Sequence, residues 1–257
     1  MKRHLVLTLI AAGLSLLSIA SANAWSVATN VPATAITSIP PGGFAITKSG
    51  NYYLATNLTV SGLAGIVVEA SEVTIDLNGR TLSGTGPAGF QIGILVLGEQ
   101  DVIVQQGDID KFAYGVLWLP GTAGVNAKNR VEDVNFNNNE IAVMSESGTS
   151  NWVKQCVIDG GDVGVLLNDD IGSRVSHSIF EEQQASQSVG VGAAIFTEAR
   201  RGNLFDENLI ARATTPGGNA DGIIASTLDK VRFDSFVNYA ATVPIIGAKD
   251  LTDLSEN

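Results

Sequence analysis

Three side chains suited to sugar binding recur at equal spacing in the middle of the chain. Arg130, Trp152 and Arg174 are separated by 22 residues each, and Glu132 and Lys154 share this spacing. An indole face packs on the C–H surface of a sugar, and a guanidinium fork binds a carboxylate or a sulfate. If 22 residues make one structural repeat, these side chains line a groove for a negatively charged glycan.

The same residues allow a second interpretation that needs no ligand. An exposed strand carries charges for solubility, and arginine stacks on tryptophan as a cation–π ladder. Both interpretations require that successive segments of the chain lie on top of each other in register.

A repeat through most of the chain indicates such stacking. An aliphatic residue is followed five positions later by Leu, Ile or Phe at Leu77…Leu82, Val104…Ile109, Val131…Phe136, Val153…Ile158, Val175…Phe180, Leu204…Leu209 and Val231…Phe236. The first members, which we call anchors, lie 22 to 29 residues apart. Before each anchor runs a second apolar segment, which usually opens with a glycine such as Gly65, Gly93, Gly115 or Gly164. Short apolar segments separated by Gly, Asn and Asp predict strands.

The repeat predicts an all-β fold, a right-handed parallel β-helix of about seven or more coils with terminal caps. We expect residues 61–236 to form the β-helix and residues 25–60 the N-terminal cap and first coil. Residues 237–257 are expected to form the C-terminal cap or tail.

Strand alternation predicts which side chains point outward around each anchor. The preceding positions are Asp76, Ile103, Arg130, Trp152, Arg174, Asn203 and Lys230. The following positions are Asn78, Gln105, Glu132, Lys154, Ser176, Phe205 and Arg232. From these columns we predict a glycan-binding surface made of Arg130, Trp152, Arg174 and Glu132.

The first residues predict export. A basic start, an apolar run from Leu5 to Ile19 and the sequence Ala22-Asn23-Ala24 form a signal peptide over residues 1–24, cleaved after Ala24. Cleavage leaves 13 basic and 26 acidic residues, a net charge of −13. This charge argues against nucleic acid and anionic lipid as partners. We therefore expect a secreted or periplasmic monomer without a membrane insertion.

At this point the sequence resembles the right-handed parallel β-helix proteins of the pectate-lyase-like superfamily. The stretches that carry the resemblance are residues 50–54 (GNYYL), 73–79 (VTIDLNG) and 130–139 (RVEDVNFNNN). It covers residues 50–236 and implies the fold more specifically than an activity. Many members are lyases, hydrolases or epimerases of acidic polysaccharides, but this chain contains no complete catalytic motif of those enzymes.

The resemblance implies candidate catalytic residues. A lyase of this kind holds Ca²⁺ with acidic residues, here Asp169 and Asp170, and removes a proton with Lys154 or Arg174. Hydrolysis instead needs two carboxylates across the bond, for which Asp133 and Asp170 are the available pair. The structural alternative is that these aspartates shape turns. His177, the sole histidine after residue 24, is expected at a turn or facing solvent.

Two functions remain open from the sequence. The first is an exported β-helix protein that binds or processes an acidic extracellular polysaccharide on its strands. The second is a non-catalytic envelope, adhesion or structural module whose repetitive surface is its function.

Overall fold

The computed structural model describes residues 32–86, 89–122, 126–181, 183, 192–198, 202–211, 220–232, 234–237, 245–246 and 250–252. The chain divides into two units, Met1–Val31 and Pro32–Asn257, and every described residue belongs to the second. The predicted signal peptide and its cleavage site after Ala24 therefore lie outside the described residues.

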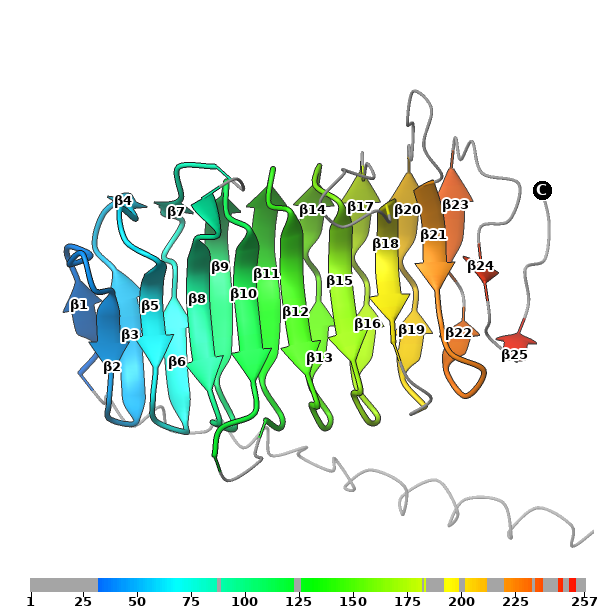
Figure 1. Ribbon diagram of the computed structural model, residues 1–257, viewed down its shortest axis with the longest axis horizontal. Coiled ribbons are helices and arrows are strands. Elements are labelled where there is room, and N and C mark those ends of the chain that lie inside the picture. Colours follow the sequence, from blue (N-terminus) through cyan, green and yellow to red (C-terminus); the bar gives the residue numbers. More distant parts are fainter. Residues whose placement is uncertain are drawn as a thin grey trace, which may run out of the picture. The chain divides into compact units, whose positions relative to one another are not determined.

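The second unit contains two sheets whose strands alternate along the chain (Figure 1). Within the described residues, the nine-stranded sheet has the order β2 (Phe44–Ile46), β5 (Ala64–Val68), β8 (Ile92–Leu97), β10 (Tyr114–Leu119), β12 (Ile141–Glu146), β15 (Val163–Asn168), β18 (Gly192–Thr197), β21 (Ala220–Ile224) and β24 (Ile245–Ile246). Each of these strands pairs in parallel with the equivalent strands of the preceding and following coils.

The other sheet has a main row of strands and a shorter row beside it. The main row is β1 (Thr34–Ile36), β3 (Gly50–Leu54), β6 (Val73–Asp76), β9 (Ile103–Asp110), β11 (Arg130–Asn137), β13 (Trp152–Lys154), β16 (Arg174–Ser176), β19 (Leu204–Asp206), β22 (Lys230–Arg232) and β25 (Asp250–Thr252). The shorter row is β4 (Leu58–Thr59), β7 (Thr81–Ser83), β14 (Val157–Asp159), β17 (Ile179–Glu181), β20 (Leu209–Ala211) and β23 (Ser235–Val237). We call the outward surface of the main row the strand face.

The strands of the two sheets point in opposite directions, as expected when a chain winds around one axis (Figure 1). All strand pairs are parallel, and the described residues between them contain no α-helix. The predicted all-β parallel β-helix of the right-handed type is thus confirmed, with a coil number close to the prediction.

Inward side chains stack into continuous columns that make the core. One column on the main row is at most 4% exposed and consists of Ile75, Val104, Val131, Val153, Val175, Phe205 and Val231. Its counterpart on the nine-stranded sheet is fully buried and consists of Ile66, Ile94, Val116, Val143, Val165, Ile195 and Ile223. Burying each such side chain contributes about 1.5–3 kcal/mol. Stability is therefore a sum over contacts between neighbouring coils.

A column of small residues lets phenylalanine rings fill the interior. A Cβ atom on Gly115 would lie 2.6 Å from the Ala142 carbonyl oxygen and 2.9 Å from the ring of Phe136. At Gly164 the same atom would lie 2.5 Å from the ring of Phe180. These contacts explain why the second apolar series so often opens with glycine.

Buried polar side chains link the coils at one corner. The backbone N–H of Asn129 donates to Oδ1 of Asn151 at 2.9 Å, and that of Asn151 donates to Oγ of Ser173 at 3.1 Å. The N–H of Ser173 donates in turn to Oδ1 of Asn203 at 2.9 Å. A buried N–H without a hydrogen-bond partner lowers the stability of the folded state. By pairing these N–H groups, the ladder stabilises the turns, where apolar packing does not.

The first repeat is shifted by two residues from its prediction. Its anchor is Ile75 rather than Leu77, because Ile75 pairs with the anchor of β9. A turn at residues 77–80 lengthens the segment between β6 and β7, so the five-residue spacing does not hold there. The outward positions are consequently Thr74 and Asp76, where the sequence predicted Asp76 and Asn78.

The sixth repeat is shifted by one residue. Phe205, rather than Leu204, pairs with both neighbouring anchors and is fully buried. Asn203 is also buried and belongs to the polar ladder. The outward positions are consequently Leu204 and Asp206, where the sequence predicted Asn203 and Phe205.

Both stretches predicted as caps contribute strands to the sheets. Within residues 25–60, β1 to β4 pair in parallel with later strands. Within residues 237–257, β24 and β25 continue the two sheets by parallel pairing with β21 and β22. The described part of these stretches shows no separate cap beyond these strands.

Candidate functional site

The three residues that led the sequence analysis lie side by side on the strand face. Arg130 pairs with Trp152, and Trp152 pairs with Arg174, on the successive strands β11, β13 and β16. Adjacent strands are about 4.8 Å apart. The side chains of Arg130 and Arg174 are 34% and 33% exposed, whereas the intervening anchors are buried. The predicted register and facing are therefore confirmed here.

Cations from two strands cover the indole of Trp152. The Lys154 Nζ atom lies 5.0 Å from the ring centroid, and the Arg174 Cζ atom lies 5.3 Å from it. The indole Nε1–H donates to Oγ of Ser176 at 2.9 Å. These contacts fix the ring orientation, and they are the cation–π ladder of the second interpretation.

Glu132 balances the cations at the N-terminal side of the indole. Its Oε2 atom lies 3.0 Å from Nζ of Lys154 and 3.5 Å from Nη1 of Arg130. Glu132 thus orients two basic side chains from neighbouring strands. This role differs from the direct ligand contact that the sequence analysis gave it.

Asp206 has the same role at the other side of the indole, and the sequence analysis missed it. Its Oδ2 atom accepts hydrogen bonds from Nη2 of Arg174 at 2.6 Å and from Nη2 of Arg232 at 2.7 Å. Nε of Arg232 donates to its Oδ1 atom at 2.9 Å. Hydrogen bonds and charge from Arg232, and then from Arg174, lower the pKa of Asp206 below its ordinary value of 3.8.

A signal for Asp206 was present in the sequence. Phe205 and Ile210 also have the five-residue spacing, so they compete with Leu204 and Leu209 as the anchor pair. Choosing Phe205 places Asp206 outward in the column of Glu132 and Lys154.

Together these side chains form what we call the basic strip, which consists of Arg130, Glu132, Trp152, Lys154, Arg174, Asp206, Lys230 and Arg232. The strip has five cations and two anions, a net charge of +3. The whole chain has a net charge of −11. The strip is therefore a local positive region on an acidic protein.

The other sequence-predicted carboxylates do not join the strip. Asp133 is exposed at a corner of its coil, with a φ of 54°. Asp169 occupies a different corner, with a φ of 55°, in the position that Ser147 occupies one coil earlier. Asp tolerates this left-handed conformation better than most residues. Both residues therefore shape turns.

Asp170 faces the interior, where it completes the polar corner. It is 1% exposed and accepts hydrogen bonds from Oγ of Ser145 at 2.9 Å, the N–H of Gly148 at 2.7 Å and Oγ of Ser173 at 2.8 Å. Burial raises the pKa of this carboxyl group, although the hydrogen bonds oppose the change. Asp170 is thus separated from the exposed carboxylate of Asp133, and the two do not flank a common bond.

Asp169 and Asp170, which the resemblance implied as Ca²⁺ ligands, lie at a corner and in the interior, respectively. The described residues contain no group of three or more His, Cys, Asp or Glu side chains that could hold a metal ion. His177 lies at a corner with a φ of 53°, and its Nε2 atom is 2.6 Å from Oε2 of Glu207 on the next coil. Both of these side chains are about half exposed, at 49% and 50%.

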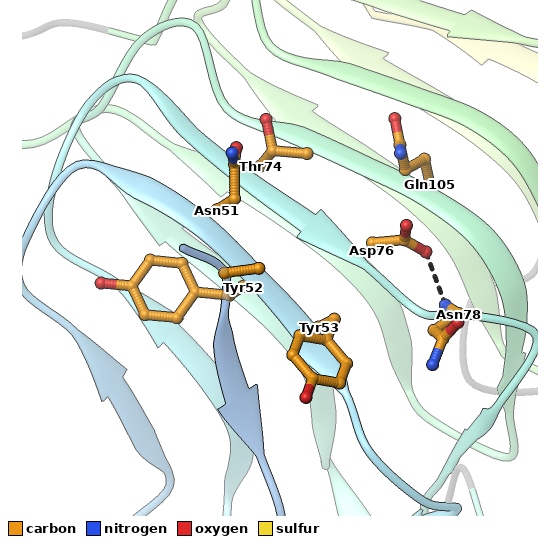
Figure 2. A pocket seen from close by; sticks show the side chains of 8 residues that line it. Asn51, Tyr52, Tyr53, Thr74, Asp76, Asn78 and Gln105 are labelled. Atoms are coloured by element: carbon orange, nitrogen blue, oxygen red, sulfur yellow. Dashed lines mark hydrogen bonds between the residues drawn. The ribbon is translucent and has the colours of Figure 1, made fainter. Parts of the chain in front are cut away.

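A pocket of about 480 Å³ opens on the strand face near its N-terminal end. Its lining comes mainly from β3, β6 and β9 and consists of Ala33, Asn51, Tyr52, Tyr53, Thr74, Asp76, Asn78 and Gln105 (Figure 2). Gln105 pairs in the outward column with Glu132, so the pocket adjoins the basic strip. The sequence analysis placed three of these residues in its columns but did not recognise a pocket.

Comparisons with protein-family models, with curated proteins and with solved structures found no match to this chain. In the described residues, no helix has the length and apolar character needed to cross a membrane.

Proposed function

We propose that this chain binds an acidic polysaccharide along the basic strip. The observation that carries the proposal is the row of partly exposed cations around one indole, on consecutive strands of a protein with net charge −11. An extended anionic polymer laid across β11, β13 and β16 would meet a cation or an aromatic ring at each step.

The side chains of the strip are held in position before a ligand arrives. Glu132 and Asp206 each fix two cations, and the indole packs under Lys154 and Arg174. Preorganisation of this kind reduces the entropic cost of binding.

Binding is better supported than catalysis. Lys154 and Arg174, the candidate bases, are each engaged by a carboxylate at 3.0 Å and 2.6 Å. The candidate acids Asp133 and Asp170 lie at a corner and in the interior. The proposal places this binding outside the cell, in line with the predicted signal peptide and the resemblance to pectate-lyase-like β-helix proteins.

A second function, a structural or adhesion module, is favoured by one observation. The described ion pairs within the strip satisfy Glu132 and Asp206 internally, so the strip is stable without a ligand. In that case the charges keep an exposed strand face soluble, and no glycan binds.

Calorimetric titration with hexagalacturonate separates the two functions. We expect saturable binding that Arg174→Gln weakens about tenfold, because one charged hydrogen-bonded contact is lost. Lys111→Gln is the matched control, since Lys111 is a half-exposed cation outside the strip that pairs with Asp110. If Arg174→Gln and Lys111→Gln lose hexagalacturonate affinity equally, or if the wild type does not bind, the binding proposal fails and the structural function is favoured. Absorbance of unsaturated ends, with and without Ca²⁺, tests for lyase activity in the same samples.

A further inference from the structure

The pocket next to the basic strip differs from it in chemistry. The eight lining residues include no lysine or arginine. Its volume of about 480 Å³ lies within the range of small-ligand sites, about 300–1,000 Å³. It is a candidate site in its own right, because no residue of the strip lines it.

The side chains around the pocket are suited to hydroxyl groups. Asn51, Thr74 and Gln105 each offer both hydrogen-bond donors and acceptors. Within the described chain, none of these three forms a side-chain hydrogen bond, so their polar atoms are available to a ligand. Figure 2 shows Asn51 beside Thr74 on the adjacent strand, with Gln105 on the strand beyond. A sugar hydroxyl, which both donates and accepts, matches this set.

The ring of Tyr53 supplies an apolar surface next to these polar groups. Tyr53 points outward from β3, pairs with Asp76 on β6 and is partly exposed. A tyrosine ring at a binding site contributes apolar contact at its face and a hydroxyl at its edge. This combination of a ring and amides is suited to a pyranose, which has C–H faces and a rim of hydroxyls.

The charge of the pocket opposes an acidic sugar. Asp76 is the one charged residue in the lining, and its Oδ1 atom accepts a hydrogen bond from the backbone N–H of Asn78 at 2.6 Å. A uronate here would meet a carboxylate without a balancing cation among the lining residues. The pocket and the strip therefore select opposite ligand classes.

We infer that this pocket binds a neutral pyranose, with the Tyr53 ring against a C–H face of the sugar and Asn51, Thr74 and Gln105 bound to its hydroxyls. The inference stands apart from anion binding on the strip, because the two regions share no residue. It extends the proposed function to a second class of sugar on the same strand face.

Titration with cellohexaose, mannohexaose and xylohexaose tests the inference on the full chain. We expect at least one of these neutral probes to bind, and Tyr53→Ala to weaken that binding about five- to tenfold through lost stacking. Asn51→Ala should weaken it several-fold, whereas Asn135→Ala, an exposed asparagine outside the pocket, should not. Thermal melting of each variant establishes that the fold is intact.

The strip variants keep this test separate from the test of the proposed function. Arg130→Gln combined with Arg174→Gln should leave neutral-sugar binding unchanged even if hexagalacturonate binding is lost. Absence of binding by all three neutral probes would overturn the inference, as would binding that Tyr53→Ala does not affect. Tighter, salt-sensitive binding of a glucosamine hexaose would also overturn it, because Asp76 would then be selecting a cation.

Discussion

The two ends of the strand face have the same backbone and different chemistry. On β3, β6 and β9, the outward positions hold amides, a hydroxyl, a tyrosine and a carboxylate around a pocket. On the main-row strands from β11 to β22, the same two columns hold five cations, two anions, an indole, a leucine and a serine. The parallel pairing is continuous between them, with Gln105 directly opposite Glu132.

This difference shows how a β-helix separates stability from recognition. Inward columns repeat aliphatic side chains, because each coil must pack on the next. Outward columns have no such requirement, so neighbouring coils can change from neutral to charged within one strand spacing of about 4.8 Å. The two proposed binding surfaces therefore need no change in the fold between them.

The largest expected difference between the two regions comes from removing both exposed arginines. Arg130→Gln with Arg174→Gln should weaken hexagalacturonate binding about a hundredfold, because two charge-assisted contacts are lost. Asp206 remains paired with Arg232 in this variant, so the strip keeps its structure. Calorimetry with hexagalacturonate and with a neutral hexaose measures both regions. Equal losses for both sugars would show that the two regions are one site.

A smaller effect is expected from the indole. Trp152→Ala should weaken hexagalacturonate binding about tenfold, because the sugar loses a ring and two cations lose their support. Since Trp152 points outward, the free energy of unfolding should change by less than about 1 kcal/mol. Thermal and urea unfolding of Trp152→Ala and wild type measure this change in the free energy of unfolding. A loss of several kcal/mol would mean that the indole belongs to the core, contrary to the register of β13.

The smallest effect concerns stability and pH. The lowered pKa of Asp206 means that its ion pairs stabilise the fold above its ordinary pKa of 3.8, and that this contribution is lost as the pH falls further. Asp206→Asn should therefore be about 1 kcal/mol less stable than wild type at pH 7, with a difference that shrinks below pH 4. Urea unfolding across this pH range measures the difference. If the free energies of unfolding of wild type and Asp206→Asn differ by the same amount down to pH 2, Asp206 stabilises the fold by packing and not by its charge.

The sequence predicted the fold and the centre of the strand face well. From Val131 to Val175, successive anchors are 22 residues apart, so spacing translates directly into strand pairing. Arg130, Trp152 and Arg174 are adjacent for this reason. The ion pairs of Glu132 with Arg130 and Lys154 were beyond prediction, because backbone register does not specify side-chain rotamers.

The sequence prediction failed where the pattern was ambiguous or the coil length changed. Residues 204 and 205 are both apolar, so strand alternation does not show which of them is the anchor. Taking Leu204 as the anchor left Asp206 out of the predicted site. At residues 77–80 an extra turn altered the spacing. Asp170 was predicted as a Ca²⁺ ligand, a catalytic carboxylate or a turn residue, yet four neighbours hydrogen-bond it in the interior, and residue spacing does not show toward which side of a turn a side chain points. The pocket depends on the shape formed by three coils, which no single repeat reveals.

Tryptophan fluorescence during titration with hexagalacturonate tests the central claim most directly. Of the three tryptophans, Trp118 is fully buried, and Trp152 lies among the cations of the strip. We predict a saturable change in emission that disappears in Trp152→Phe and weakens as salt is raised. An emission that stays constant up to millimolar hexagalacturonate, or a change that persists in Trp152→Phe, would contradict binding at the basic strip.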